Sequence, residues 1–277
     1  MRGKGRNGFV LCELWRKTTA ERQILFGVRN KDEQLDCSMI FSFKKQRGNY
    51  TLLKRIGKGR FGVCYLAASE DGKPVVVKRL KSNLFKKNNP INVNEAVILS
   101  QIDHPAVPEI LGVINEKRFY GFVLQQMPGV PLEKLLFKQK HVFMPGEIRG
   151  IGIQLIDILK YLHGHGIVHR DISISNVLIH DRNVSLVDFG LAQWMIGRKD
   201  QLVNDDFAQL GDLLLYLHYS SFVKQRGKRK PWFEELSLTK EQIHFYKRLL
   251  GLEDPYSAVD EVEKDFLAAF SAYSSMS

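Results

Sequence analysis

Residues 169–179, HRDISISNVLI, decide the fold of this chain. A His-Arg-Asp triplet is followed, five residues after the aspartate, by an asparagine. Such a loop is typical of sites that transfer phosphoryl groups, because Asp171 can accept a hydrogen bond from an attacking hydroxyl while Asn176 offers its side-chain oxygen to Mg²⁺. The stretch therefore predicts a phosphoryl-transfer site, although Ser173 and Ser175 are unusual residues within such a loop.

Three charged residues outside this loop would complete the site. Asp188 opens the triplet DFG and would supply a harder ligand for Mg²⁺. Lys78 closes the apolar run VVVK, and a lysine at the end of a buried strand must find a partner or become neutral. Glu95, in the run NEAVIL, is a plausible partner, and the pair would aim Lys78 at the α- and β-phosphates of a nucleotide. Each residue taken singly could be a surface charge, but the neighbouring motifs favour the paired arrangement.

The run IGKGRFGVC contains three glycines in the pattern G-x-G-x-x-G, namely Gly57, Gly59 and Gly62. A dinucleotide-binding turn uses similar glycines, but that turn opens a helix. Residues 50–68 predict instead a strand, a turn and a second strand. We therefore expect a turn whose backbone N–H groups approach triphosphate oxygens with no Cβ in the way, and whose tip residue, Phe61, shields the phosphates from water.

Periodicity divides the chain into three parts. Residues 1–48 form a basic N-terminal extension in which turn signals do not clearly separate helices or strands. Residues 49–127 are rich in strand signals, and residues 128–277 are mainly helical. One helix of the last part, expected within residues 146–166, places its apolar side chains on a single face, at Ile148, Ile151, Leu155, Ile158 and Leu162. The pattern predicts an α+β fold of two lobes, a small β-rich lobe followed by a mainly helical one.

The ordered motifs GKGRFG, VVVK, NEAVIL, HRDISISN and DFG resemble the protein kinase family from about residue 50 to residue 270, in the manner of bacterial Hanks-type serine/threonine-protein kinases. This resemblance is specific, because the motifs occur together and in order. It implies a bilobed protein-kinase-like fold that binds ATP and Mg²⁺ in the cleft between a small N-lobe and a larger C-lobe. The catalytic residues that it implies are Asp171, Lys78, Glu95, Asn176 and Asp188, of which Asn176 and Asp188 bind the metal.

The resemblance also implies where the nucleotide lies. The hinge would be residues 125–127, whose backbone groups would bind adenine, with Leu124 as gatekeeper. Contacts with the cofactor are implied for Ile56, Gly57, Gly59, Gly62, Cys64, Val76, Lys78, Leu124, Gln125, Met127 and Leu178. Cys64 replaces a usual valine and Val76 a usual alanine, so the total volume around the base can be kept.

Further positions match the internal scaffold of the family. Asp206, in DFAQLG, matches the aspartate that anchors the catalytic loop from a buried helix. Leu99, His169 and Phe189 match members of a stacked apolar column that joins the lobes. His169 is accordingly interpreted as a packed structural histidine rather than as an acid–base group.

The catalytic loop departs from the family pattern at two positions. Serine/threonine kinases usually place lysine where this chain has Ser173, and tyrosine kinases usually place arginine where it has Ser175. One contribution to stabilising the transferring phosphoryl group is therefore missing. We expect this loss to cost ~2–4 kcal/mol, which slows the enzyme without abolishing its activity.

The segment after DFG is short. Seventeen residues separate Asp188 from Asp205, no A-P-E motif lies between them, and the arginine that usually pairs with that motif is absent from LEDPYSAVDEV. In the family, the glutamate of A-P-E forms an ion pair with that arginine. The absence of both residues is physically consistent, because a buried arginine without its partner would be costly. Residues 191–205 also contain no Ser, Thr or Tyr, so Arg170, which often clamps a phosphate there, would have none to hold. We expect a short form of the kinase, controlled by a protein partner or by expression.

The favoured hypothesis is an ATP-dependent protein kinase that transfers the γ-phosphoryl group of MgATP to Ser or Thr hydroxyls, on itself or on a partner protein. Two alternatives stay open. In the family, the segment after DFG also holds a floor for the substrate peptide, and its shortness here would suit a kinase for small molecules, although Arg170 argues against this. Ser173 would also suit a nucleotide-binding scaffold that has no catalytic activity.

Net charge and the cysteine pattern indicate which partners and which cellular location to expect. The 277 residues carry a net charge of +11, and KQRGKRK at 224–230 is a compact basic run. We interpret this run as a solvated loop or as a patch for an acidic protein partner, with nucleic acid less favoured. Cys12, Cys37 and Cys64 fit neither a disulfide framework nor a zinc site, and no run of about 18 apolar residues could span a membrane. We therefore expect a cytoplasmic transferase.

Overall fold

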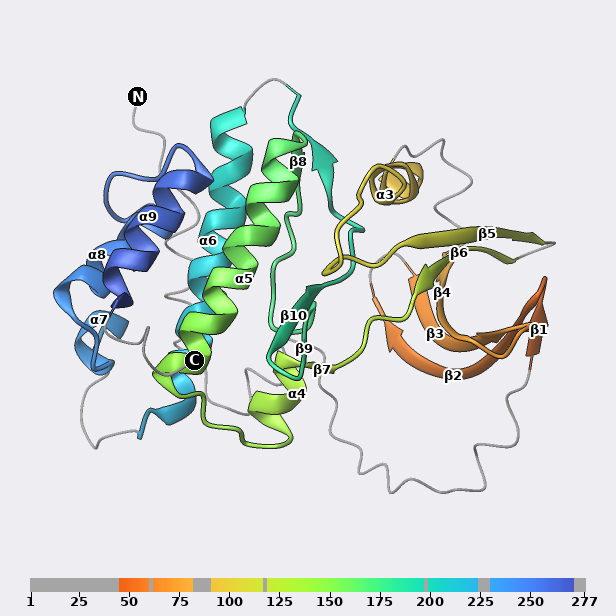
Figure 1. Ribbon diagram of the computed structural model, residues 1–277, viewed down its shortest axis with the longest axis horizontal. Coiled ribbons are helices and arrows are strands. Elements are labelled where there is room, and N and C mark those ends of the chain that lie inside the picture. Colours follow the sequence, from red (N-terminus) through yellow and green to blue (C-terminus); the bar gives the residue numbers. More distant parts are fainter. Residues whose placement is uncertain are drawn as a thin grey trace.

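A computed structural model of the protein describes residues 45–59, 62–81, 91–116, 119–196, 199–223 and 230–271. Two lobes lie side by side, one built mainly of strands and the other mainly of helices (Figure 1). The predicted bilobed α+β fold is thus confirmed. The expectations for residues 1–44, for Phe61 and for residues 224–229 of the basic run lie outside the described residues.

Among the described residues, the small lobe is a six-stranded antiparallel sheet that curls on itself (Figure 1). Its strands, in the spatial order β1-β2-β3-β4-β6-β5, are β1 (Lys45–Arg47), β2 (Tyr50–Lys58), β3 (Gly62–Ser69), β4 (Pro74–Leu80), β5 (Ile110–Glu116) and β6 (Phe119–Gln125). The curl brings the turn after β1 to the end of β5, where the backbone N–H of Gly48 donates to the carboxylate of Glu116. The two edges of the sheet therefore meet at one end.

The first strand begins at Lys45, so the sheet includes residues that the sequence analysis assigned to the extension 1–48. This strand holds only Lys45, Gln46 and Arg47, which pair with Leu52, Thr51 and Tyr50 of β2. A short, charged strand at a sheet edge carries no hydrophobic alternation, which is why its sequence does not reveal it. The division of the rest of the chain into domains stays a prediction.

The valines of β4 divide between the two faces of the sheet. Val75 and Val77 point into the curl, where they are at most 4% exposed. Because successive side chains of a strand alternate, Val76 and Lys78 lie on the opposite face. That face carries the helix α3 (Ile91–Leu99), whose Ile98 and Leu99 are buried. Lys78 therefore leaves the sheet on the side of α3 and of the large lobe.

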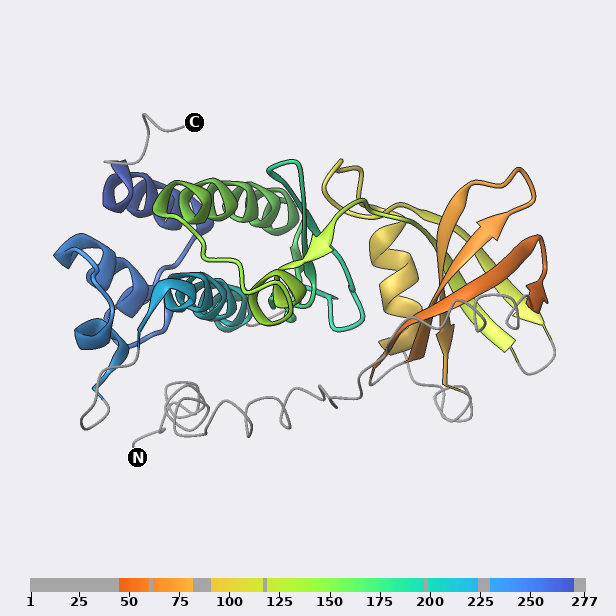
Figure 2. The same ribbon diagram turned by 90° about the horizontal axis from the view of Figure 1, so that it is seen from below.

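Two long antiparallel helices, α5 (Pro145–Gly164) and α6 (Lys199–His218), form the centre of the large lobe (Figure 2). The predicted apolar face of α5 is confirmed, because its members are at most 6% exposed. The helix α9 (Val259–Ala269) packs so closely on α5 that a Cβ added at Gly152 would lie 2.3 Å from the Phe266 ring. The short helices α7 (Trp232–Glu235) and α8 (Lys240–Leu249) complete the lobe. No helix in the described part of the chain has both the length and the apolar character needed to cross a bilayer.

Short strands lie on the side of the large lobe that faces the sheet (Figure 1). They are β7 (Val130–Pro131), β8 (Ile167–Val168), β9 (Val177–His180), β10 (Asn183–Leu186) and β11 (Gln193–Trp194), and the helix α4 (Leu132–Phe137) follows β7. The strands β10, β9 and β7 form one sheet, and β11 pairs with β8. Strands of two to four residues are too short to show an alternating pattern, so the sequence gives little sign of them.

The helix α6 contains a carboxyl group that should make stability depend on pH. The Oδ1 atom of Asp212 is buried and has no hydrogen-bond partner among the described residues. Burial raises the pKa of Asp212 from 3.8 to about 7. Between these two values the folded chain keeps a proton that the unfolded chain releases, so the free energy of unfolding falls as pH rises from about 4 to about 7.

Replacing Asp212 by Asn should remove this dependence. We expect the Asp212→Asn protein to match the wild type below pH 4 and to be more stable above pH 7, by up to about 4 kcal/mol. Denaturant unfolding at several pH values measures the difference. The exposed Asp254 provides the control, and Asp254→Asn should leave the pH profile unchanged. Equal stability of Asp212→Asn and wild type at pH 7.5 would contradict the interpretation.

Candidate active site

The loop 169–176 lies between β8 and β9, and the Asp206 carboxylate of α6 accepts hydrogen bonds from its backbone. The backbone N–H of Arg170 donates to Asp206 Oδ1 at 2.7 Å, and that of His169 donates to Oδ2 at 2.9 Å. His163 Nε2 also lies 2.9 Å from Oδ2. The anchoring role expected for Asp206 is therefore present in the structure, and the carboxylate, itself fully buried, fixes where the loop begins.

Within the loop, Asp171 and Asn176 are in direct contact. The side-chain nitrogen of Asn176 donates to Asp171 Oδ2 at 2.9 Å and to the Asp171 carbonyl oxygen at 3.0 Å. Since the amide nitrogen is used in this way, the amide oxygen is the atom of Asn176 that could bind a metal ion. Burial raises the pKa of Asp171 above its usual range, which favours its taking up a proton.

Asp188 lies next to this pair. The backbone N–H of Val187 donates to the Asn176 carbonyl oxygen at 2.9 Å, which brings the start of DFG beside the catalytic loop. Asp188 has a positive φ of 66°, and its Oδ1 accepts a hydrogen bond from the Gly190 N–H at 3.3 Å. The two candidate metal ligands, Asn176 and Asp188, therefore belong to one site.

Lys78 connects this site to the small lobe. Its Nζ atom lies 2.6 Å and 2.8 Å from the two carboxylate oxygens of Glu95 and 2.6 Å from Asp188 Oδ1. The ion pair expected between Lys78 and Glu95 is thus present, and both side chains are almost fully buried. Three separate elements, β4, α3 and the loop after β10, contribute one charged group each.

The charges of this cluster support one another. Burial alone would lower the pKa of Lys78, but the carboxylates of Glu95 and Asp188 outweigh burial and raise it, so the ammonium stays charged. Burial likewise opposes ionisation of Asp188, yet the Lys78 ammonium lowers its pKa below the usual value. The Asp188 side chain keeps 44% of its surface exposed, so this carboxylate can also reach a ligand.

His169 and Phe189 pack together beneath the charged groups. Their rings meet edge to face with centroids 4.6 Å apart, and the backbone N–H of Asp171 donates to His169 Nδ1 at 3.2 Å. Both residues are buried, and Phe189 belongs to the same apolar core as Leu99 of α3, a core that extends across both lobes. Burial also lowers the pKa of His169, so the ring is held neutral. His169 is therefore a packed structural histidine, as the sequence indicated.

The glycine turn above the site has two kinds of glycine. A Cβ at Gly59 would meet nothing within 4 Å, and one at Gly57 would meet only the Cys64 Cβ, at 3.9 Å. A Cβ at Gly62 would instead lie 2.2 Å from the carbonyl oxygen of Arg79. Gly62 is therefore required for the close approach of β3 and β4, a reason that differs from the expected approach to phosphate. Gly57 and Gly59, in contrast, are not required by packing against their described neighbours.

Three of the side chains expected to contact the base, those of Cys64, Val76 and Leu124, lie on one face of the small-lobe sheet. Cys64 lies directly opposite Lys78 in the sheet, and Val76 lies opposite Leu124, so all four share the face toward the large lobe. Burial raises the pKa of the Cys64 thiol to about 11, which keeps it neutral. Ile56, at the turn, is 52% exposed.

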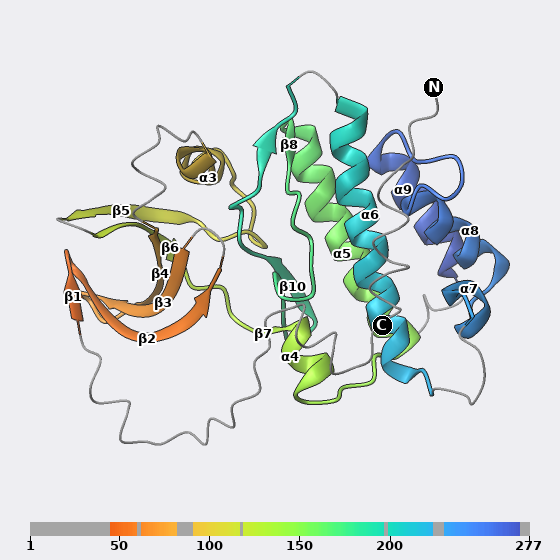
Figure 3. The same cartoon turned by 180° about the vertical axis from the view of Figure 1, so that it is seen from behind.

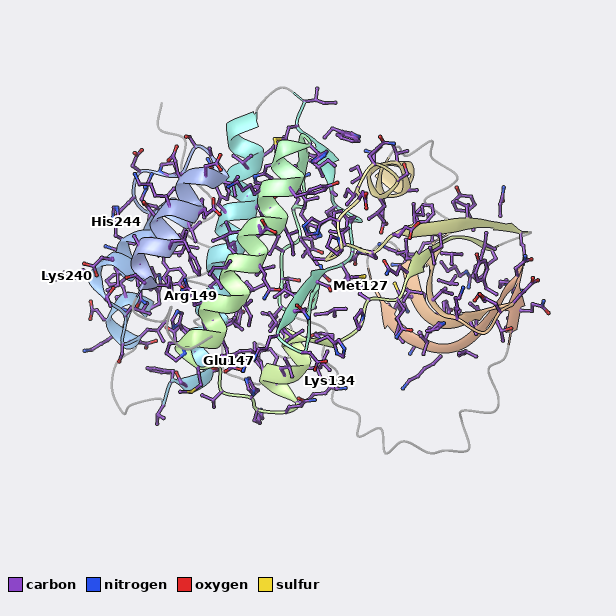
Figure 4. All side chains as sticks on the ribbon, in the orientation of Figure 1. Met127, Lys134, Glu147, Arg149, Lys240 and His244 are labelled. Atoms are coloured by element: carbon purple, nitrogen blue, oxygen red, sulfur yellow. The ribbon has the colours of Figure 1, made fainter. Side chains whose placement is uncertain are left out.

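The chain crosses between the lobes at the expected hinge. Met127 is buried at this crossing (Figure 4), and Leu178 of β9 pairs with Pro131 of β7 just beyond it. The backbone N–H of Gln125 already donates to the Glu109 carbonyl oxygen at 2.8 Å. The N–H of Gln125 is therefore engaged within the small lobe, and the adenine contact implied at residues 125–127 would use other backbone groups.

Sequence reasoning did not identify two polar residues that support the loop. Gln209 Oε1 accepts from the Ile172 N–H at 2.7 Å, and its Nε2 donates to the Arg170 carbonyl oxygen at 3.0 Å. His163 supports Asp206 as described above. The only sequence signal for Gln209 is its position three residues after Asp206, on the same side of the helix, and this spacing alone does not distinguish it from a surface glutamine.

The residues present fit a nucleoside triphosphate with a divalent cation. An open glycine turn, a buried but charged lysine, a partly exposed carboxylate and an amide oxygen converge between the lobes. Beside them, Asp171 Oδ2 accepts a hydrogen bond from Asn176 at 2.9 Å. Fold and site together define a bilobed phosphotransferase.

Comparison with known proteins agrees with this class. The model of the protein kinase domain matches residues 50–209. The probable serine/threonine-protein kinase YbdM of Bacillus subtilis is 33% identical over 225 residues, which cover 78% of this chain and 87% of that protein. The serine/threonine-protein kinase PLK4 of Xenopus tropicalis is 30% identical over 158 residues, which cover 56% of this chain and 17% of PLK4. The CTD kinase subunit alpha of Schizosaccharomyces pombe is 32% identical over 163 residues, which cover 58% of this chain and 27% of that protein.

The chain belongs to the protein kinase family, and it is a Hanks-type serine/threonine-protein kinase. Members of this family use ATP with Mg²⁺ and act on proteins. The chain spans most of the Bacillus relative but less than a third of the two eukaryotic ones.

Proposed function

We propose that this chain binds MgATP between its lobes and transfers the γ-phosphoryl group to Ser or Thr hydroxyls, on itself or on a partner protein. One observation carries the proposal, namely that Lys78 joins Glu95 of the small lobe and Asp188 of the large lobe at 2.6 Å each. Lys78 can contact both carboxylates only when the two lobes are close enough to bring all three charged groups into one site. The family and its serine/threonine kinase relatives support the same reaction.

Each residue of the site has a separate task in this proposal. Lys78, held in place by Glu95, binds the α- and β-phosphates, and Asp188 and Asn176 hold the metal ion. Magnesium, when bound, supplies positive charge that neutralises the triphosphate and the transferring group. Asp171 orients the acceptor hydroxyl and takes up its proton as the new P–O bond forms and ADP leaves.

The proposal is tested by mass spectrometry of the purified chain after incubation with MgATP and a generic acceptor such as casein. We expect phosphoserine or phosphothreonine on one of the two proteins. Asp188→Ala should give none, whereas Asp181→Asn, a change at an exposed aspartate, should behave like wild type. Thermal stabilisation by ATP without phosphate on either protein would indicate a scaffold. ATP consumption only with a panel of metabolites would indicate a small-molecule kinase.

The two serines of the catalytic loop hydrogen-bond to each other, since their Oγ atoms lie 2.9 Å apart. Neither provides a cation for the transferring group. We predict that Ser173→Lys raises kcat for protein phosphorylation by about tenfold, because it restores part of the missing charge stabilisation. Steady-state kinetics measure this, with Ser237→Lys, a lysine at an exposed serine, as the control. An unchanged kcat in Ser173→Lys would show that the lysine is not needed in this chain.

We also place the protein in the cytoplasm, on the ground that its cysteine pattern fits a reducing compartment. The basic run 224–230 stays a candidate patch for an acidic protein partner, with nucleic acid less favoured. Only Lys230 of this run is among the described residues.

A further inference from the structure

The segment after DFG forms a strand against the catalytic loop. Gln193 and Trp194 of β11 pair with Val168 and Ile167 of β8, which immediately precedes the His-Arg-Asp triplet. The backbone N–H of Met195 extends the ladder by donating to the Gly166 carbonyl oxygen at 2.7 Å. This segment is therefore fixed by backbone hydrogen bonds to the strand that enters the active site.

Arg170 joins the segment to the loop through its side chain. Its Nη1 atom donates to Gln193 Oε1 at 3.0 Å, and its Nε atom lies 3.9 Å from Asp205 Oδ2. The backbone of Arg170 has a positive φ of 64° and is held at both ends, by Asp206 at the N–H and by Gln209 at the carbonyl oxygen. Arg170 thus combines a strained backbone, fixed by two hydrogen bonds next to Asp171, with a side chain held by Gln193.

The same strand also contacts the helix that carries Glu95. β11 lies beside α3 as well as beside β8 (Figure 3). Met195, just after β11, packs against the core that includes Ile98 and Leu99 of α3. The position of β11 is therefore linked to Asp171 on one side and to the Lys78–Glu95 pair on the other.

We propose that Gln193 is a positioning residue whose amide oxygen holds Arg170 in place of a phosphate, so that the active site is assembled without phosphorylation of residues 191–205. The proposal rests on the proposed kinase function. It is motivated by the printed sequence of this segment, which has no hydroxyl side chain, and by the direct bond from Arg170 to Gln193. We call the hydrogen bond from Arg170 to Gln193 the brace. Because the Gln193 amide is part of the sequence and is not added by a kinase, a phosphatase cannot remove the brace.

Kinetics of phosphatase-treated enzyme test the brace. We expect treated wild type to start without a lag and Gln193→Ala to lose about 10- to 100-fold in kcat, the range for a lost hydrogen bond to a charged group, with little change in KM for ATP. Gln193→Glu should stay within a fewfold of wild type, because its carboxylate accepts the same bond. Gln139→Ala, at an exposed glutamine, is the control. A lag in treated wild type, or full kcat in Gln193→Ala, would overturn the proposal.

Hydrogen exchange gives a readout that does not depend on activity. We expect faster exchange of the backbone amides of residues 166–172 in Gln193→Ala than in wild type, and unchanged exchange in Gln193→Glu. If the wild type failed to phosphorylate any protein, this result would still decide whether Gln193 braces the loop. Identical exchange in wild type and Gln193→Ala would reject the brace even in an active enzyme.

Discussion

Asp171→Asn should lower kcat by about 10³-fold while leaving the affinity for MgATP within about threefold of wild type. The asparagine has nearly the same shape and can keep one hydrogen bond with Asn176, so the loop should stay folded. It cannot take up the proton of the acceptor hydroxyl. Among the described residues, Asp171 hydrogen-bonds to Asn176, whereas Lys78 bonds to Glu95 and Asp188, so the substitution leaves the bonds of Lys78 in place.

Two measurements on the same protein separate chemistry from binding. Single-turnover phosphorylation gives the rate of the chemical step, and the shift of Tm on adding MgATP reports nucleotide affinity. Asp181→Asn is the matched control, because Asp181 is exposed and its φ of 46° suits asparagine. A rate of more than a tenth of the wild-type value in Asp171→Asn would exclude Asp171 as the base. Loss of the Tm shift would indicate a binding role instead.

The charged groups of the site could be predicted from the sequence because their chemistry restricts their residue types. A lysine at the end of a buried apolar strand needs a carboxylate, and the structure supplies Glu95 at 2.6 Å. The expected anchor Asp206 likewise accepts backbone hydrogen bonds from the catalytic loop. In both cases a buried charge has few acceptable partners, so the partner can be named.

The neutral polar residues could not be predicted in this way. Gln193 and Gln209 form hydrogen bonds that hold Arg170, but a glutamine on a strand or a helix is equally common on a solvated surface. Strand β5 was also missed, since it lies at a sheet edge where Leu111 and Val113 are exposed and only Ile114 is buried. Edge strands and amide side chains acquire their roles from tertiary neighbours that the local pattern does not contain.

The stretch LEDPYSAVDEV shows how the large lobe does without the usual interior arginine. Tyr256 of this stretch is 1% exposed, and its hydroxyl donates to Asp265 Oδ2 at 3.0 Å. The guanidinium carbon of Arg248, from α8, lies 3.9 Å from the centroid of the Tyr256 ring, and Nη1 of the same residue donates to Asp265 at 2.7 Å. An aromatic ring and a partly exposed arginine thus pack together in this region, and the joint loss of both partners of the usual ion pair stays a prediction.

Lys78→Met should abolish activity and also destabilise the fold, and the two effects can be separated. Glu95 is 3% exposed and bonds only Lys78 among the contacts described, so the substitution leaves a buried carboxylate without a counter-charge. Breaking a buried pair in this way costs about 3–5 kcal/mol. The cost should shrink at low pH, because a protonated Glu95 carries no charge.

The double variant Lys78→Met/Glu95→Gln tells the structural role of the pair from its catalytic one. Its uncharged side chains remove the penalty at position 95, so we expect its free energy of unfolding to recover most of the loss, while kcat/KM stays at least about 10³-fold below wild type. Urea unfolding and phosphorylation assays on the wild type, Lys78→Met, Glu95→Gln and the double variant complete the cycle. Recovery of activity along with stability would mean that Lys78 only supports the fold. Failure of stability to recover would mean that Lys78 is needed beside Asp188 rather than beside Glu95.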